Sequence, residues 1–462
     1  MSSVPPSSVD QRDAICALAT PPGVAGLAVI RVSGRDAVHI ASRHFSGMNL
    51  ADVADHTIHY GWWVADDVRV DAVTATVFRA PHSYTGEDVV EVGCHGGPFV
   101  VEQILNSLSQ HCRTAEPGEF TRRAFLNGKM DFTQVEAVAD LIHSQTRAGA
   151  QTAARQLAGG FTKRLHELRD TLYSASGLLE VELDFSEEGY EFVSREAFMA
   201  TLREGMTYAE HLADTARAAE ILRSGFYCAV VGYPNAGKSS LFNALLNRPR
   251  AIVSHVPGTT RDYLEEALVI DGYTIHLYDT AGLRATEDTI ELQGITLTTS
   301  LIEQSNLIMV VNDLSLGADH SRALRTELLQ RFPGIPTVTV HNKVDLTSAQ
   351  APYQLGDPGE TAIACSAATG EGIDGIRALL LAAVKTSSAG LSDALINARQ
   401  AALLRSVVSS LKSAEAALRD HAPADLVAID VRAAVRLLGE ITGETWNPDI
   451  LDAVFAKFCI GK

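Results

Sequence analysis

A glycine-rich loop in the middle of the chain has the residue types and spacing that bind phosphate. In the stretch VVGYPNAGKSSLFNAL, Gly232 is followed by four residues and then by Gly237, Lys238 and Ser239, between an expected strand and an expected helix. In such a loop the backbone N–H groups cradle phosphates, the lysine reaches the β- and γ-phosphates, and the serine hydroxyl ligates Mg²⁺. The residues expected to hold a nucleoside triphosphate here are Asn235, Ala236, Gly237, Lys238, Ser239 and Ser240.

Two later stretches, HNKVD and CSAATGEG, predict which base is bound. Each follows directly on a β-rich run, and the first carries Asp345. A carboxylate can accept two hydrogen bonds from the N1–H and amino groups of guanine, whereas adenine offers no such pair of donors. We therefore expect GTP rather than ATP. The residues expected to contact the base are Asn342, Lys343, Asp345, Ser366, Ala367 and Ala368.

Two loops between these motifs have the composition of nucleotide switches. VSHVPGTTRD carries Thr259 and Thr260, whose hydroxyls can reach the γ-phosphate and Mg²⁺. The later loop is expected to contact the terminal phosphate through Asp279, Thr280, Ala281 and Gly282. In many nucleotide switches the next residue is a glutamine that orients the attacking water. Here it is Leu283, which can neither donate nor accept a hydrogen bond.

The missing glutamine predicts another source of catalytic assistance. The amide oxygen of Asn235 can ligate a monovalent cation beside the phosphates, and carbonyl groups around Ser254 and Val256 can complete its coordination shell. Such a cation would place positive charge where other GTPases use an arginine finger. The water still needs to be oriented, and the residues alone do not choose among the downstream acids Glu287, Asp288 and Glu291.

Composition and charge narrow the class of protein. The 462 residues carry a net charge of -18, which argues against broad electrostatic adhesion to nucleic acid, although a local basic patch stays possible. The six cysteines are scattered without a CxxC pair, a pattern typical of a reducing compartment rather than of a zinc or disulfide scaffold. We find neither a secretory signal nor an apolar run of about 18 residues, so we expect a cytoplasmic protein without a membrane span.

The composition changes along the chain and predicts a multidomain fold of α/β and all-α parts. We expect an N-terminal α+β domain at 1–120, a discontinuous helical domain at 121–222 and 386–462, and an inserted Ras-like P-loop G domain with a mostly parallel α/β sheet at 223–385. Short β-rich runs predict strands at 13–20, 26–33, 57–64, 72–78, 88–94, 226–232, 273–279, 306–313, 337–343 and 361–367.

Two helices are predicted in detail within the helical domain. Thr133 and Glu136 have the spacing of a capping box at the start of a helix. The apolar face expected for that helix comprises Val135, Val138, Leu141 and Ile142. A second helical stripe comprises Leu404, Val407, Val408, Leu411 and Leu418.

Beyond the G domain, the chain resembles the tRNA modification GTPases of the MnmE (TrmE) family over nearly its full length, from about Ala14 to Lys462. The resemblance is carried by ATPPG, IRVSG, SYTGEDVVEVGCHGGP, PGEFTRRAFLNGKMDFTQVEAVADLI, LGEITGE and the final FCIGK. One loop departs from the family, because Val24 and Ala25 stand where an arginine and a glycine are usual. Ser254 likewise replaces the more usual threonine and keeps the oxygen.

The resemblance implies an activity and its partners. Members of this family hydrolyse GTP with potassium stimulation as the G domains of two subunits meet, and they form a homodimer through the N-terminal domain. With the FAD-dependent partner MnmG they add an aminomethyl or carboxymethylaminomethyl group to the wobble uridine of tRNA. A formyl-tetrahydrofolate bound by the N-terminal domain is thought to supply the one-carbon unit. Because the chain is acidic, we expect MnmG to supply much of the basic surface for tRNA, with Arg122 and Arg123 either as local contributors or, as is more usual, as ordinary exposed arginines.

The resemblance also implies roles for particular residues. It places potassium ligands at Asn235, Ser254, Val256 and Thr259, Mg²⁺ ligands at Ser239 and Thr260, and the catalytic glutamate at Glu291, beside Lys238. It places folate contacts at Arg31, Glu91, Lys129 and Lys462. Cys459 lies in the C-terminal signature where a catalytic thiol has been considered, although a cysteine near a helix end is more often a small core residue.

Two other functions share the G-domain motifs. The first is a GTPase that acts only as a binding switch, for example in ribosome assembly, but such proteins carry RNA-binding appendages that we do not find in this sequence. The second is a structural G-domain scaffold, which would have a degenerate phosphate loop, whereas this loop is intact.

Overall fold

The computed structural model describes residues 13–184, 195–246, 265–279, 299–347, 360–388, 394–445, 448–456 and 458–462. The chain divides into two compact units. The first unit comprises 1–139, 156–206 and 406–462, and the second comprises 140–155 and 207–405. The four-part division at 120, 222 and 385 stays a prediction. None of the helices in the described ranges is long and apolar enough to cross a membrane.

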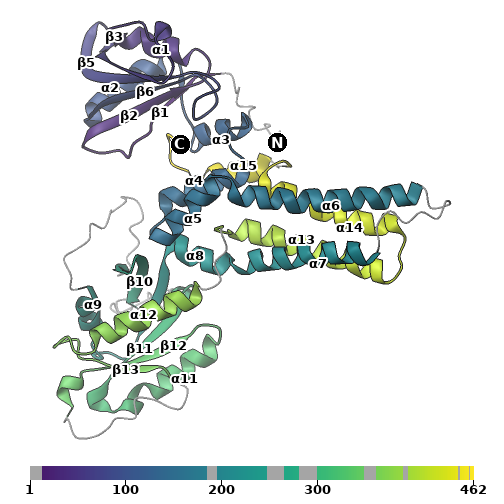
Figure 1. Cartoon of the computed structure of the whole chain (residues 1–462). Helices are drawn as coiled ribbons and strands as arrows, with labels where there is room; N and C mark the ends of the chain where they lie inside the picture. Colours follow the sequence, from purple (N-terminus) through teal and green to yellow (C-terminus); the bar gives the residue numbers. More distant parts are fainter. Residues whose placement is uncertain are drawn as a thin grey trace, which may run out of the picture. The chain divides into compact units, whose positions relative to one another are not determined.

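The first unit begins with a seven-stranded sheet in the order β3-β4-β5-β6-β2-β1-β7 (Figure 1). Its strands are β1 (Ile15–Leu18), β2 (Ala25–Ser33), β3 (Phe45–Ser46), β4 (Thr57–Ala65), β5 (Val68–Phe78), β6 (Val89–Gly96) and β7 (Arg113–Thr114). Neighbouring strands are antiparallel except for β1 and β7, which are parallel. The five strands expected up to residue 94 are thereby confirmed.

Two helices pack on one face of this sheet, and Phe120 of α3 (Glu119–Leu126) packs on Ile15 and Ala17 of the other face. The helices α1 (Ala37–His44) and α2 (Pro98–Ser109), together with the short 3₁₀ turn η1 (Leu50–Asp52), pack on inward side chains of the strands. Trp63 is fully buried there, and its indole N–H donates to Ser107 Oγ of α2 at 3.0 Å. Because side chains alternate along a strand, the neighbouring positions of β4 point to the opposite, open face. That face exposes Ile58, Tyr60 and Trp62 by 68%, 71% and 37%.

A buried ionic network joins this sheet to helix α3 (Glu119–Leu126). The Arg123 guanidinium is 4% exposed and contacts carboxylate oxygens of Asp13 at 2.7 Å, Glu119 at 2.9 Å and Glu87 at 3.3 Å. Burial favours the neutral acid at Glu119, yet hydrogen bonds from Arg113 and Arg123 hold its pKa below the usual value. The prediction that Arg123 contacts tRNA is therefore wrong, because its charge is buried and already paired.

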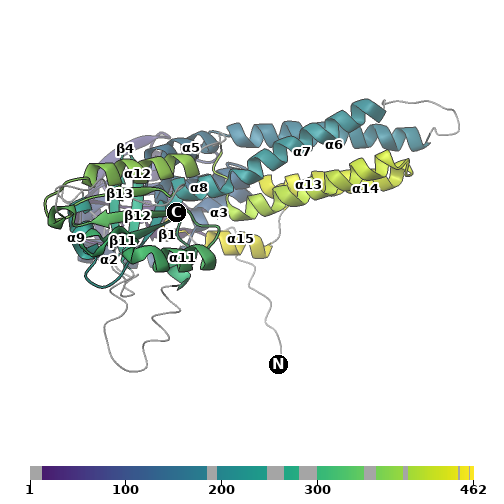
Figure 2. The ribbon, with the colours of Figure 1, turned by 90° about the horizontal axis from the view of Figure 1, so that it is seen from below.

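The rest of the first unit is helical. Its helices are α3, α4 (Phe132–His143), α6 (Gly160–Asp184), α7 (Arg195–Asp214), α13 (Ala398–Arg419), α14 (Ala424–Thr442) and α15 (Pro448–Phe455), of which α4, α7 and α13 continue into the second unit. Figure 2 shows α6, α7, α13 and α14 running side by side. A Cβ added at Gly205 of α7 would lie 3.2 Å from Leu168 Cδ1 and 3.3 Å from Leu411 Cδ1, so α7 packs closely on α6 and α13. The predicted stripe from Leu404 to Leu418 is buried, as expected.

Helix α4 (Phe132–His143) begins two residues earlier than its predicted cap requires. Asp131 Oδ1 accepts hydrogen bonds from Gln134 N at 2.9 Å and from Thr133 Oγ1 at 2.7 Å, and Asp131 N donates to Gln134 Oε1 at 2.9 Å. The capping box is therefore formed by Asp131 and Gln134, and the prediction of Thr133 and Glu136 was wrong. Of the apolar face expected for this helix, Val135 and Val138 are buried, whereas Leu141 and Ile142 are exposed.

The second unit contains a six-stranded sheet in the order β13-β12-β11-β8-β10-β9. Its strands are β8 (Phe226–Val231), β9 (Glu265–Ile270), β10 (Tyr273–Asp279), β11 (Leu307–Asp313), β12 (Thr337–Asn342) and β13 (Ala362–Ala364). All neighbouring pairs are parallel except β9 and β10. The five strands expected after residue 226 are confirmed, and the edge strand β9 was missed.

Helices cover both faces of this sheet, as expected for a parallel α/β fold. The apolar faces of α8 (Ala216–Ser224), α9 (Lys238–Leu246) and α12 (Ile373–Ser387) pack in one core with β8, β11 and β12. The helix α11 (Arg322–Arg331) packs in a second core on Ala229, Ile308 and Val310. The helix α5 (Arg147–Leu157) adds a small apolar cluster with α8. The short 3₁₀ turns are η4 (Leu314–Leu316), η5 (Ala318–Ser321) and η6 (Val344–Leu346).

Candidate functional site

The nucleotide motifs meet at one edge of the second sheet. Because β8, β10, β11, β12 and β13 are parallel, their carboxyl ends lie along the same edge. The phosphate loop follows β8, Asp279 ends β10 in register with Val230, Asn342 ends β12, and Ser366 follows β13. Ligands of open α/β sheets bind at this carboxyl edge, so the topology brings the predicted groups together where a nucleotide would bind.

The phosphate loop has the backbone that its sequence demands. Asn235 and Gly237 both have positive φ, at 63° and 90°. A Cβ at Gly237 would lie 2.2 Å from Asn342 Nδ2, so only glycine fits this position. The ammonium of Lys238 is buried against the loop and donates to the Gly232 and Tyr233 carbonyls at 2.8 and 2.9 Å. The side chains of Asn235 and Ser239 are exposed at the loop and at the first turn of α9.

The carboxamide of Asn342 connects three loops at this edge. It is 2% exposed, and its Nδ2 donates to the Ala236 carbonyl of the phosphate loop at 3.0 Å. Its Oδ1 accepts from the backbone N–H of Ala367 at 3.0 Å. A neutral amide has both a donor and an acceptor, so one side chain fixes the phosphate loop and the CSAATGEG loop relative to each other.

The remaining base-contacting candidates surround this bridge. Lys343 has positive φ of 67°, and its ammonium pairs with Asp313 Oδ2 at 2.7 Å at the end of β11. Burial opposes the charge of Asp313, but hydrogen bonds from Lys343 and Ser315 hold its pKa below the usual value. Asp345 is exposed in η6. Asp313 was missed by sequence reasoning, although its place after a buried β-run in VVND was a usable signal.

Hydrogen bonds within the turn after β13 hold the backbone of that turn in one conformation. Ser366 is fully buried, and its Oγ accepts from Thr369 N at 3.1 Å. The Ser366 backbone N–H donates to Glu371 O at 2.9 Å. Ala367 is half-buried and Ala368 is exposed. The turn therefore holds Ala367 beside Asn342, and the contact of these residues with a purine stays a prediction.

Several predicted G-domain residues lie outside the described residues. They are Ser254, Val256, Thr259, Thr260, Thr280, Ala281, Gly282 and Glu291, together with Leu283 and the side chain of Asp279. Their roles stay predictions.

A second cluster forms in the first unit around Arg31 and Glu91, which face each other across β2 and β6. The Arg31 Nε and Nη2 atoms lie 2.9 and 2.8 Å from Glu91 Oε1. The guanidinium also lies 5.1 Å above the centre of the Tyr84 ring. Burial raises the pKa of Tyr84, whose hydroxyl bonds Thr121 Oγ1 at 2.9 Å. Sequence reasoning missed Tyr84, which lies in the quoted SYTGEDVVEVGCHGGP stretch without a distinctive chemistry of its own.

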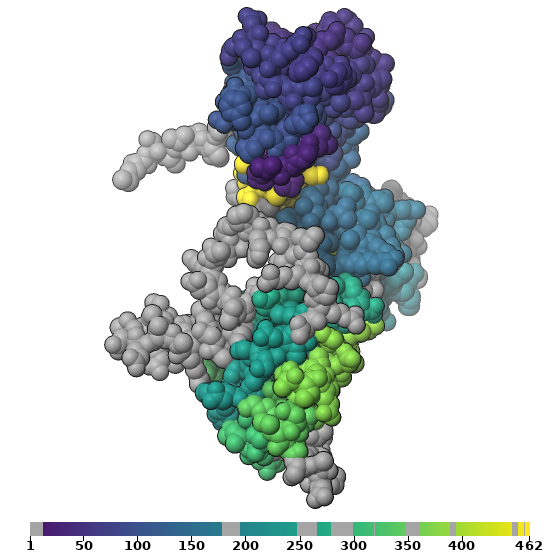
Figure 3. Space-filling model, turned by 90° about the vertical axis from the view of Figure 1, so that its left-hand side faces the viewer, coloured from purple at the N-terminus to yellow at the C-terminus, as the bar shows by residue number. Residues whose placement is uncertain are grey.

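The C-terminal residues pack on the same place. Arg31 Nη1 approaches the Gly461 carbonyl at 3.4 Å, and the Gly118 N–H donates to Cys459 O at 3.4 Å. A Cβ at Gly461, where φ is 97°, would lie 2.1 Å from Leu18 O, so the final residues can follow β1 only with glycine there. In Figure 3 the yellow C-terminal atoms accordingly lie against purple N-terminal atoms.

The chain end brings two more predicted residues to Arg31. Burial and the Arg31 charge lower the pKa of Lys462, while the charges of Glu91 and Cys459 oppose that shift. Cys459 is exposed, so the alternative of a small core residue was wrong. Lys129 is exposed and donates instead to the Pro81 carbonyl at 2.9 Å, in the loop that leads to Tyr84. Val24, at the departure from the family loop, is 90% exposed.

Replacing Asn342 with alanine should weaken GTP binding by at least about tenfold, because it removes two buried hydrogen bonds that hold the phosphate and base loops together. A titration with a fluorescent GTP analogue measures this. Asn306→Ala is the matched control, since Asn306 Oδ1 also accepts a backbone hydrogen bond, from Tyr227 N at 2.8 Å, but next to the opposite end of β11. Equal affinities for the two variants would contradict the bridging role.

Comparison with known proteins extends these observations to the whole chain. Residues 14–129 match the family model described as the GTP-binding protein TrmE N-terminus, and residues 132–459 match the MnmE helical domain. The chain is 40% identical over 471 residues to the tRNA modification GTPase MnmE of Christiangramia forsetii, covering 98% of this chain and 99% of that protein. The MnmE of Salinibacter ruber is 42% identical over 463 residues, covering 98% and 100%.

Among solved structures, the chain is similar to the G domain of the T. maritima FeoB iron transporter, with 25% identity and a TM-score of 0.27 over 34% of this chain and 98% of that one. The full-length relatives and the two family models carry the assignment. The chain, with its phosphate loop and guanine-binding motifs at one sheet edge, belongs to the MnmE (TrmE) family of tRNA modification GTPases.

Proposed function

We propose that this chain hydrolyses GTP in the cytoplasm to support the addition of an aminomethyl or carboxymethylaminomethyl group to C5 of the tRNA wobble uridine. The FAD-dependent protein MnmG would be its partner, and a folate would supply the one-carbon unit. The observation that carries the proposal is the bridge made by Asn342, which joins an intact phosphate loop to the guanine-binding loops at one sheet edge. Relatives that match 98% of the chain are named tRNA modification GTPases.

The described residues fit GTP with Mg²⁺. Lys238 already lies in the phosphate loop with its ammonium on backbone carbonyls, from which it can move to the β- and γ-phosphates. Ser239 exposes its hydroxyl at the start of α9, where it would hold Mg²⁺ together with Thr260. Bound there, the metal would neutralise charge on the β- and γ-phosphate oxygens. Asp345 would accept the guanine N1–H and amino hydrogens, with Lys343, Ser366, Ala367 and Ala368 around the base.

We infer potassium dependence from the phosphate loop and Leu283. Asn235 holds an exposed amide in a left-handed backbone conformation, a position from which its oxygen can face the phosphates. It would ligate the cation together with Ser254, Val256 and Thr259. A potassium ion would supply positive charge next to the transferred phosphoryl group. Glu291 would orient the attacking water indirectly, in the place of the missing glutamine.

Turnover of GTP in potassium and in sodium buffers tests this proposal. We expect potassium to accelerate the wild type by at least about tenfold, Asn235→Ala to lose that acceleration, and Glu291→Ala to stay slow in both salts, since one charged contact to a transition state is worth orders of magnitude in rate. Glu303→Ala is the matched control, because Glu303 is an exposed acid of the same unit. A GTP turnover rate that is the same in potassium and in sodium, and that neither substitution lowers, would favour the binding-switch alternative.

We infer a formyl-tetrahydrofolate site at the cluster of Arg31, Glu91 and Lys462. The described groups fit such a ligand, because a pterin offers polar edges to a carboxylate and its glutamate tail offers carboxylates to cationic side chains. Glu91 keeps its Oε2 free of the two Arg31 hydrogen bonds, which both go to Oε1. Lys129 and the exposed Cys459 would lie at the margins of the site, and Cys459 would be its candidate nucleophile.

Calorimetric titration with 5-formyl-tetrahydrofolate tests that site. Glu91→Gln should weaken binding by about 10- to 100-fold, because hydrogen bonds to a charged group contribute roughly 1.5 to 3 kcal/mol. Glu102→Gln removes an exposed acid from α2 of the same domain and should leave the affinity unchanged. An unchanged affinity in Glu91→Gln would place the folate elsewhere or exclude it.

We infer that the homodimer forms through the open face of the N-terminal sheet. Ile58, Tyr60 and Trp62 form an exposed apolar stripe on β4, and the Arg69 guanidinium lies 4.9 Å above the Trp62 ring. Contiguous apolar surface of this kind is typical of association sites. The same face carries Arg31 and Glu91, so a second subunit would close over the folate cluster.

Sedimentation of Tyr60→Asp tests the dimer. We expect dissociation to rise by at least about tenfold, since the substitution buries a charge in an apolar contact. Met48→Asp, at a side chain exposed by 50% in the loop before η1, is the matched control and should stay dimeric. If Tyr60→Asp remains dimeric, the interface lies elsewhere.

A further inference from the structure

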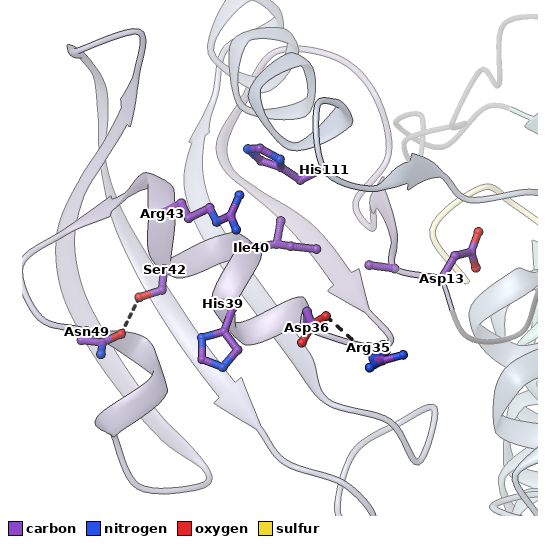
Figure 4. A pocket seen from close by; sticks show the side chains of 10 residues that line it. Asp13, Arg35, Asp36, His39, Ile40, Ser42, Arg43, Asn49 and His111 are labelled. Atoms are coloured by element: carbon purple, nitrogen blue, oxygen red, sulfur yellow. Dashed lines mark hydrogen bonds and ion pairs between the residues drawn. The ribbon is translucent and has the colours of Figure 1, made fainter.

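A polar hollow of about 840 Å³ lies on the helix-covered side of the N-terminal sheet. Its wall is built by the turn before α1, by α1 itself, by Asn49 at the start of η1, and by His111 after α2 (Figure 4). Ile40, which is 7% exposed, and Ala14, which is also 7% exposed, give it an apolar floor. Neither the nucleotide site nor the folate cluster uses any of these residues.

Four basic side chains lie around this hollow. His39 and Arg43 are four residues apart on the exposed face of α1, and Arg35 lies in the turn before this helix. His111 approaches from the end of α2, and Figure 4 shows the Arg43 side chain extending towards it. All four side chains are exposed. The arrangement places two arginines and two histidines on one surface.

The acidic side chains at the hollow do not fully neutralise the positive charges of Arg35 and Arg43. Both oxygens of Asp13 are already paired, Oδ1 with Arg123 at 2.7 Å and Oδ2 with Arg113 at 2.7 Å. Asp36 is 3.9 Å from Arg35, a loose contact between two exposed groups. Arg43 makes no ion pair with any residue in the ranges that the structure describes. The hollow therefore keeps uncompensated positive charge.

The side chain behind the hollow responds to this charge. His44 is stacked on Trp63 at 5.4 Å, and its Nδ1 lies 3.1 Å from the Val64 carbonyl. Burial lowers the pKa of His44, and His111 and Arg43 lower it further, whereas the Val64 carbonyl and the charge of Asp66 oppose this shift.

We propose that this hollow binds phosphodiester groups of the tRNA backbone. The inference rests on the proposed function in tRNA modification, and it assigns a contact surface to this chain itself. The net charge of -18 repels a polyanion over most of the surface, so any direct contact must use a local site where cations outnumber available acids. Long exposed arginines on a shallow surface suit a phosphate chain, since such contacts position nucleic acid without reading its sequence.

The hollow stays accessible in the proposed dimer. The helices α1 and α2 cover one face of the sheet, whereas the apolar stripe of β4 and the folate cluster lie on the other face. A tRNA held at the hollow would therefore not compete with the second subunit. The hollow takes the place of Arg123 as the expected tRNA contact, because the charge of Arg123 is buried.

Equilibrium binding of an unmodified tRNA transcript to the full chain, over a series of salt concentrations, tests the proposal. We expect Arg35→Ala/Arg43→Ala to weaken binding by about tenfold or more at low salt. The slope of log affinity against log salt should fall by about 2, because each of the two arginines would neutralise one phosphate. Arg405→Ala is the matched control, because it removes an exposed arginine from α13, outside the hollow and outside the proposed dimer face. GTP turnover should be unchanged in all variants, and their circular dichroism spectra should match that of the wild type, which shows that they are folded.

The possible outcomes separate a failure of the hollow as a tRNA site from a failure of the proposed function. If the wild type binds tRNA and the double variant binds it equally well with the same salt slope, the hollow does not bind tRNA and the proposed function is unaffected. If the wild type does not bind tRNA either alone or with MnmG, the proposed function fails and this inference fails with it. If inorganic phosphate at matched ionic strength removes the difference between wild type and double variant, the hollow is a site for small phosphate anions, and the tRNA assignment is overturned.

Discussion

The buried carboxamide of Asn342 is the contact on which the nucleotide edge of this protein depends. Parallel pairing of the strands brings five loops to one edge, but it does not fix the loops relative to one another. Asn342 does so with one donor and one acceptor, to Ala236 and Ala367. An unpaired amide buried at this place would cost about 1 to 3 kcal/mol, so the loops are held in the only arrangement that satisfies both of its ends. Gly237 completes the fit because any Cβ would meet Nδ2.

The first unit is organised around charge pairs rather than around a single bridge. Arg123 contacts three acids inside the unit, and Arg31 pairs with Glu91 on the sheet. Both arginines are therefore committed to internal contacts, and so is Arg113. The exposed cations left on the N-terminal domain include Arg35 and Arg43 at the hollow. In a chain with a net charge of -18, the binding of a polyanion depends more on which basic side chains are exposed and unpaired than on the total number of basic residues.

The two faces of the N-terminal sheet carry different kinds of side chain. Side chains alternate across β4, so Trp63 contributes to the core while Tyr60 and Trp62 form an exposed apolar stripe. The C-terminal residues reach the same sheet because glycine at position 461 lets the backbone pass within contact of Leu18. Residues from opposite ends of the chain thus form one cluster, and a shift of either end would alter the surroundings of Arg31.

The sequence by itself determined the strands, the phosphate loop, the guanine motifs and the family, because local periodicity and the spacing within a loop depend on residues close along the chain. Through the family resemblance it also placed Arg31, Glu91, Lys129 and Lys462 in one expected site. Only the tertiary structure decided that Asp131 and Gln134 cap α4, that β9 adds an edge strand, and that Asp313 pairs with Lys343. It also decided that Arg123 is buried whereas Arg43 is exposed at the hollow. Burial and charge pairing are set by partners distant in sequence, such as Asp13 and Arg123, and a linear pattern contains no measure of their distance.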